Sequence, residues 1–260
     1  MTIGPQELPR RAIHGGRAGR AAAELEPLLD GPVHAPSSTG AAIELAGDPT
    51  AGTLRRVLAV VGATGTHDVA ATLGWAAAHD VGVVVLDPRP RRMDTLPTTG
   101  ARPVLALSLS RVDGVSTDLR TRGVRAGVGA AWSALHREAA RVEQDAPGPG
   151  GPRRPRALLR RPGTVAHGVG ALTKLGVTLV TGNGVVHRLG AGAGDPDLWW
   201  AYRVRPELAG VVTEVEIDPW DVTVLARRPA LTDAEEDRVT ATLLRHDPSG
   251  VLTRSVPESG

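Results

Sequence analysis

The sequence predicts an α+β protein built from two lobes. Short apolar, β-branched runs alternate with a helical pattern over residues 57–86. After residue 176 the chain is richer in strand-like runs. Between these parts, residues 144–163 are too dense in proline and glycine for a helix or a central strand. A length of 260 residues suits one large domain or two lobes.

The predicted organisation follows from these shifts. We expect a poorly ordered N-terminus over residues 1–24, a first lobe over 25–110, a second lobe over 111–228 and a C-terminal helix and tail over 229–260. The second lobe contains the loop 144–163, whose five arginines either solvate it or form an anion-binding patch.

In the earlier half, periodicity predicts each element in turn. A helix starts near Thr66, with Asp68 in its first turn, and ends near Asp80. Another begins at Trp132 and carries apolar residues at helical spacing. The strands expected in this half lie at 57–61, 83–86 and 104–109, with two more around a turn within 115–127.

In the later half, turn and capping residues are the main guides. Val177 to Thr181 and Val185 to Leu189 form a predicted hairpin, with positive-φ residues expected at Gly182, Asn183 and Gly184. Asp195 and Pro196 start a short helix, and residues 211–217 alternate as a half-buried strand. Thr232 and Glu235 have capping-box spacing ahead of a last helix that ends near His246.

Composition excludes several classes of function. The chain has no cysteine, so disulfides, thiolate metal sites and a cysteinyl flavin bond are ruled out. There is no phenylalanine and only one tyrosine, which makes the five tryptophans the expected core anchors. No apolar run approaches the roughly 20 residues of a membrane span, and a net charge of +2 does not favour a nucleic-acid partner. We expect a cytoplasmic protein without membrane or nucleic-acid binding.

Chemical motifs are sparse. The sequence has no P-loop, no dinucleotide fingerprint and no nucleophile elbow. Its histidines lack metal-site spacing. These motifs alone do not identify an enzyme.

The order of several longer phrases, however, resembles one family. These phrases are LEPLLDGPVHAP at 25–36, VVGATGTHDVAATLGWAAAHDVGVVV at 60–85, LALSLSRVDGVSTDLRTRGVRAGVGAAWSAL at 105–135, VTLVTGNGVVHRL at 177–189, and DPDLWWAYR followed by GVVTEVEIDPW, ending at Trp220. Together they resemble FAD-linked oxidases of the berberine-bridge-like branch, which share a flavin domain with vanillyl-alcohol oxidase and p-cresol methylhydroxylase (PCMH).

The resemblance implies a PCMH-type FAD-binding fold of two α/β lobes, with FAD between them and its pyrophosphate held by N–H groups of glycine-rich loops. The residues at matching positions are Gly127, Gly129, Gly168, Gly170, Gly210 and Val211. The alternative for each glycine is an ordinary turn or bulge residue.

The departures from the family pattern are specific. After the strand at 83–86 the family has a glycine-rich phosphate loop with a histidine that often bonds to the flavin, but here the chain reads LDPRPRRMDTLPTTG. Arg89, Arg91 and Arg92 either replace that loop as a phosphate clamp or face solvent. Two other glycine clusters are reduced, and we expect the substrate domain of such oxidases to be absent.

Three functions remain open on this basis. The first is an FAD-binding protein of FAD-linked oxidoreductase ancestry, with noncovalent FAD and reduced or partner-dependent activity on an unknown small molecule. The second is a non-catalytic relative, a pseudoenzyme that serves as an interaction or scaffold module. The third is a small reductase with the same fold. No catalytic residue is assigned: Tyr202 suits packing, and His167 suits a loop better than general acid–base chemistry.

Overall fold

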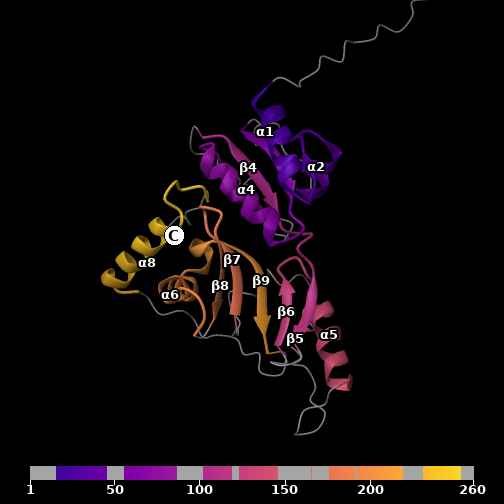
Figure 1. Ribbon diagram of the computed structural model, residues 1–260, viewed down its shortest axis with the longest axis vertical. Helices are drawn as coiled ribbons and strands as arrows, with labels where there is room; N and C mark the ends of the chain where they lie inside the picture. Colours follow the sequence, from indigo (N-terminus) through magenta and orange to yellow (C-terminus); the bar gives the residue numbers. More distant parts are fainter. Residues whose placement is uncertain are drawn as a thin grey trace, which may run out of the picture.

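The computed structural model describes residues 16–45, 56–86, 102–118, 123–145, 165, 176–190, 192–218 and 231–252. These residues form two lobes, each built on one β-sheet (Figure 1). The first lobe contains the helices α1, α2 and α4, and the second contains α5 to α8.

The first lobe is a four-stranded sheet in the order β1-β2-β4-β3. Strands β2, β4 and β3 are parallel, and the two-residue β1 is antiparallel to β2. The elements are α1 (Arg17–Leu25), the 3-10 helix η1 (Glu26–Leu28), β1 (Val33–His34), α2 (Thr39–Glu44), β2 (Val57–Gly62), α4 (Thr66–Ala78), β3 (Gly82–Leu86) and β4 (Val104–Ser108).

Both faces of this parallel sheet are buried. Ala59 and Leu105 pack with Leu73 of α4 and with α1, whereas Val60 and Ala106 pack with Ala41 of α2. A sheet covered on both sides needs apolar residues at successive positions, which explains the unbroken apolar runs in the sequence.

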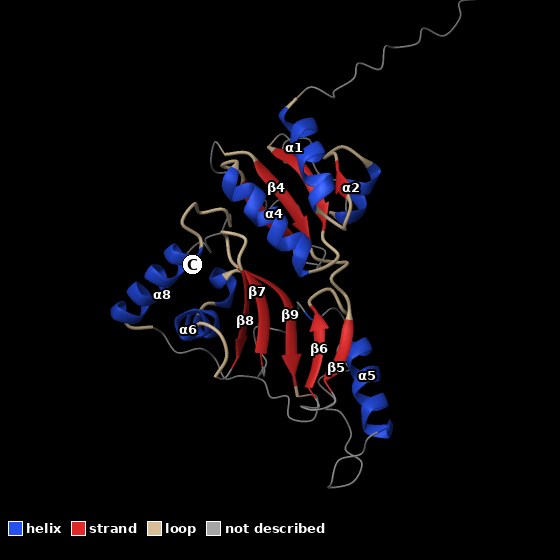
Figure 2. Cartoon of the chain, viewed as in Figure 1, coloured by secondary structure: helices blue, strands red, loops and turns tan. Residues whose placement is uncertain are grey.

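The second lobe is a five-stranded antiparallel sheet in the order β5-β6-β9-β7-β8 (Figure 2). Its elements are β5 (Val115–Asp118), β6 (Gly123–Gly127), α5 (Trp132–Asp145), β7 (Gly176–Val180), β8 (Val186–Gly190), α6 (Pro196–Val204), α7 (Pro206–Ala209), β9 (Val211–Ile217) and α8 (Asp233–His246).

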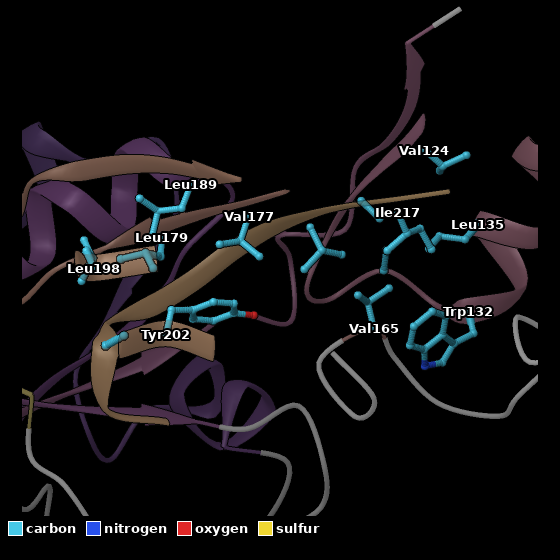
Figure 3. Packing of buried hydrophobic residues seen from close by; sticks show 14 of the residues in the cluster. Val124, Trp132, Leu135, Val165, Val177, Leu179, Leu189, Leu198, Tyr202 and Ile217 are labelled. Atoms are coloured by element: carbon cyan, nitrogen blue, oxygen red, sulfur yellow. The ribbon is translucent and has the colours of Figure 1, made fainter. Parts of the chain in front are cut away.

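One face of this second sheet carries the core. Side chains of the sheet pack with Trp132 and Leu135 of α5, Leu198 and Tyr202 of α6, and with α8 (Figure 3). On the opposite face Arg125 lies 3.5 Å from Glu216, and the Thr178 hydroxyl donates to Glu214 at 3.2 Å. This half-solvated arrangement produces the alternating burial of β9.

Most of the predicted elements are confirmed. The five strands and two helices expected before residue 146 are present with small shifts in their ends. Asp195 caps α6 by accepting the N–H groups of Asp197 and Leu198. The capping box of Thr232 and Glu235 starts α8. Tyr202 is buried in the core, which confirms the packing role predicted for it.

The hairpin turn differs from the prediction. Among Gly182, Asn183 and Gly184, only Gly184 has a positive φ, of 79°. The turn spans five residues because β7 ends at Val180 and β8 begins at Val186. A side chain at position 182 would collide with the Asp247 carboxylate, so Gly182 is required for close packing.

Two segments near the limits of the described residues form regular contacts. Helix α1 begins at Arg17, inside the segment expected to be poorly ordered. Beyond α8, the N–H of Val83 donates to the C=O of Val251 at 2.7 Å, and Leu252 forms a parallel bridge with Val83. The segment after α8 therefore adds to the outer edge of β3 in the first lobe.

Helix α4 of the first lobe packs against the second lobe. The hydroxyls of Thr66 in its first turn and Thr213 in β9 are 2.8 Å apart. At the other contact, a Cβ on Gly184 would lie 2.9 Å from the Ala70 carbonyl oxygen and from the Gly74 backbone. Helix α4 thus contacts the second lobe through a hydroxyl pair and a close backbone approach.

The start of α4 is fixed by a buried carboxylate. Asp68 is fully buried and accepts the N–H of Asp30 at 2.8 Å, the N–H of Thr64 at 2.8 Å and the Thr64 hydroxyl at 2.7 Å. Burial alone would raise the pKa of Asp68, but these bonds, with a further one from Gly31, lower it below the usual value.

We predict that Asp68→Asn lowers the free energy of unfolding by about 2 kcal/mol at pH 7, because N–H donors lose their charged acceptor. Since the pKa of Asp68 is depressed in the fold, its contribution is present at neutral pH and is lost as the pH falls below the ordinary aspartate value. The variant and wild type should therefore converge in acid.

Urea unfolding at pH 7 and pH 3 measures this difference. The exposed Asp113→Asn is the matched control and should leave the midpoint unchanged. Equal losses for the two variants at pH 7 would contradict the anchoring role of Asp68.

We also predict that the hydroxyl pair between the lobes contributes a coupling energy of about 1 kcal/mol. A double-mutant cycle with Thr66→Val and Thr213→Val keeps the side-chain shapes and removes the bond. Chemical denaturation of the two single variants and the double variant gives the coupling directly. Strictly additive losses would show that the two hydroxyls do not interact.

Candidate functional site

The carboxyl ends of the parallel strands identify the candidate site. Strands β2 and β4 run parallel and end at Gly62 and Ser108, and the arrowhead of β4 points toward the second lobe (Figure 1). In open α/β sheets, ligands bind beyond this edge. The segments that follow, 63–65 and 109–114, lie at the junction with the second lobe.

The junction is lined by aliphatic side chains from both lobes. Ala63, Leu109 and Val112 belong to the same buried cluster as Val128, Val180 and Val211. All six are at most 5% exposed. In the described residues, apolar packing thus continues from one lobe to the other.

Gly127, the last residue of β6, and Gly129, in the turn that follows, lie at this junction. The N–H of Gly127 donates to the C=O of Gly114 at 2.8 Å, and that of Gly129 to the C=O of Val112 at 2.9 Å. Between them, the N–H of Val128 donates to the C=O of Thr213 at 3.0 Å. Successive N–H groups must be free to form an anion nest, and these three already have protein acceptors.

The space around both glycines explains why a side chain is absent. A Cβ at Gly129 would lie 2.6 Å from the carbonyl oxygens of Leu109 and Ser110. One at Gly127 would clash with the carbonyl oxygen of Val112. The turn residues therefore fit against the backbone of segment 109–114, and the arrangement does not fit a pyrophosphate held by these N–H groups.

Gly210 and Val211 enter the junction from the second lobe. Gly210 has a φ of 154°, and its Cβ would lie 2.6 Å from the carbonyl oxygen of Val180. Val211 begins β9, pairs with Val180 and is buried in the shared cluster. The structure therefore brings four of the six predicted positions, Gly127, Gly129, Gly210 and Val211, to one region.

Other predicted positions lie outside the described residues. These are Gly168, Gly170 and His167, the arginines at 89, 91 and 92, and the arginine-rich loop except for its first two residues. Val165 is described: it is fully buried beside Trp132, and its N–H donates to the C=O of Ala130 at 2.7 Å. Val165 is thus hydrogen-bonded to the turn that contains Gly129.

An ionic cluster around the buried Glu44, at the end of β4, escaped the sequence analysis. The side chain of Glu44 is only 2% exposed and accepts from Arg111 Nε at 2.6 Å and from the Ser110 hydroxyl at 3.2 Å. Burial opposes ionisation, but bonds from Ser108 and Arg111 hold the pKa of Glu44 below its usual value. Because its members are far apart in sequence, no spacing signal marks this cluster.

Every polar group of this cluster has a structural partner. Glu44 and Arg111 neutralise one another, and Ser110 bridges to Ser108 at 3.0 Å. In the part of the chain that the structure describes, no group of three or more histidine, aspartate or glutamate side chains can hold a metal ion. None of the described helices is long and apolar enough to cross a membrane.

Comparisons with protein-family models and with curated proteins give no match. Solved structures do match. A single-residue variant of Physcomitrella patens BBE-like 1 has a TM-score of 0.55 and 17% identity, over 79% of this chain and 45% of that chain. Xylooligosaccharide oxidase from Myceliophthora thermophila C1 in complex with xylobiose has a TM-score of 0.51 and 17% identity, over 78% and 42%.

A chitooligosaccharide oxidase also matches, with a TM-score of 0.51 and 15% identity, over 80% of this chain and 44% of its own. The chain thus spans less than half the length of each of these proteins. At such identities the likeness concerns the fold. The expected fold class is confirmed: the chain has the fold of part of the berberine-bridge-like FAD-linked oxidases that its sequence phrases resemble.

Proposed function

We propose that this chain is an FAD-binding protein of FAD-linked oxidoreductase ancestry. The observation that carries the proposal is the two-sheet fold, which matches part of these oxidases over nearly four fifths of the chain. The order of the family-like phrases in the sequence supports the same ancestry independently of the coordinates.

The flavin is held without a covalent bond. The chain has no cysteine, and no histidine occurs between His79 and His136, the stretch that contains the loop after β3. A histidyl or cysteinyl tether at that loop is therefore chemically impossible.

Contacts to the flavin come from the predicted positions at and near the junction. Gly210 and Val211 lie at the start of β9 beside the first lobe, and Gly168 and Gly170 belong to the loop that the family places beside the flavin ring. Gly127 and Gly129 contact it only through atoms other than their N–H groups, since these groups already donate to backbone carbonyls.

Catalysis by this chain alone is reduced or depends on a protein partner that supplies the substrate site. Near the junction, the buried carboxylates among the described residues already have structural partners: Asp68 holds backbone N–H groups, and Glu44 is paired with Arg111. The substrate is a small molecule whose class we leave unassigned.

A second candidate is a non-catalytic module that keeps the fold for protein interaction. It is favoured by the junction itself, where aliphatic side chains pack together and the turn N–H groups have protein acceptors. The two candidates differ in one property, which is affinity for FAD.

We predict saturable FAD binding by the purified chain, measured as quenching of flavin fluorescence during titration in the micromolar range. Acid precipitation of the complex should release all of the flavin into the supernatant, because no tether exists. Riboflavin, which lacks the pyrophosphate and the adenosine, is the control ligand and should bind more weakly.

A flat titration would remove the flavoprotein proposal and leave the scaffold candidate. Flavin that stays with the precipitated protein would contradict noncovalent binding. If FAD binds, the rate at which oxygen reoxidises the reduced flavin measures how much oxidase chemistry the chain retains.

A further inference from the structure

We infer that contacts between protein groups fix the two lobes relative to one another, and that the most important of them involve the turn at residues 127–130. The lobe arrangement therefore does not require a bound flavin. This inference concerns the protein without cofactor and holds whether or not FAD binds. Three contacts between the lobes support it, each made by different residues.

The turn and the crossover segment 109–114 form the first contact. This segment carries the chain from β4 of the first lobe to β5 of the second. Its carbonyl groups at Val112 and Gly114 accept the N–H groups of Gly129 and Gly127. Among the described residues, this segment is the only one that carries the chain from the first sheet to the second. Its hydrogen bonds to Gly127 and Gly129 hold it against the second sheet.

The backbone of segment 109–114 lies so close to Gly129 that no larger residue fits there. The Leu109 and Ser110 carbonyl oxygens stand 2.6 Å from where a Cβ on Gly129 would be, and both belong to backbone that cannot rotate away. The turn also anchors the later chain, since the Ala130 C=O accepts the N–H of the buried Val165. Segments from three parts of the sequence therefore meet at one four-residue turn.

The second contact is the packing of α4 on the second sheet. Thr66 pairs with the buried Thr213, which also donates to the C=O of Thr178 at 3.3 Å. About one to two turns further along the helix, Gly184 fits against Ala70 and Gly74. These contacts lie at the start and in the middle of α4, so they restrict rotation of one lobe on the other.

The third contact is the segment after α8. Asp247 is buried and accepts the N–H groups of Val251 at 2.7 Å and Leu252 at 3.2 Å. Val251 is fully buried in the cluster that contains β3. The Asn183 N–H donates to the His246 C=O at 3.2 Å, which ties the same segment to the hairpin of the second lobe.

Arg102 strengthens this third contact from the first lobe. Its guanidinium donates to the C=O groups of Ser249 at 2.9 Å and Gly250 at 3.1 Å and lies 2.9 Å from Asp80. The three contacts thus join backbone and side-chain groups of both lobes at separate places. A cofactor between the lobes would therefore be added to an assembled junction, and binding would not have to bring the lobes together.

The test uses the full-length chain freed of flavin, with Gly129→Ala and the matched control Gly114→Ala. Gly114 lies in the same crossover, but a Cβ there has nothing within 4 Å. We expect Gly114→Ala to change the Tm by at most about 2 °C. Gly129→Ala should lower it by about 10 °C or more, since its Cβ overlaps fixed backbone.

Hydrogen exchange on the wild-type chain covers the case in which Gly129→Ala fails to fold. The amides of Gly127, Val128 and Gly129 should be strongly protected without flavin, and adding FAD should leave their exchange rates within about threefold. The inference is overturned if these amides exchange freely until FAD is added, or if Gly129→Ala is as stable as Gly114→Ala.

Discussion

The carboxylate of Asp68 is the interaction on which the rest of the structure depends. It gathers N–H groups from residues 30 and 64 and thereby fixes where α4 starts relative to the loops at the carboxyl edge of the first sheet. A carboxylate at a helix N-terminus also suits the helix dipole. Because α4 then contacts both β9 and the hairpin of the second lobe, an error in its start would be carried into the junction.

Sequence reasoning worked where a local physical signal decides the structure. Period-two and period-3.6 patterns located β2 to β9 and the helices α4 and α5, and the capping residues Asp195 and Thr232 located the starts of α6 and α8. The elements α1, β1, α2 and α7 were not predicted. The predicted hairpin is confirmed. The conformation of its turn was not predicted, because glycine has two uses: Gly184 is needed for its positive φ, whereas Gly182 is needed for space beside Asp247. The identity of the residue does not distinguish these uses.

Much of the candidate site was beyond such reasoning. Glu44 meets Arg111, and Val83 meets Val251, across separations of 67 and 168 residues that no spacing rule connects. The glycines at 127 and 129 match family positions, but sequence does not tell whether their N–H groups are free or already bonded. Only the coordinates show that the Val112 and Gly114 carbonyl groups accept them. The cofactor roles of the six matched residues stay predictions.

A junction made by protein groups changes what FAD affinity would mean in this chain. If a cofactor must draw two lobes together, part of its binding energy is spent on ordering them, and the apparent affinity falls accordingly. Here the lobes are already joined at the crossover turn, at α4 and at the segment after α8. Reduced glycine loops would weaken direct contacts to the phosphates, but a preformed arrangement would offset some of that loss. Such a chain can lose catalytic parts and still keep its fold, which is the condition under which either a noncovalent flavoprotein or a scaffold can persist.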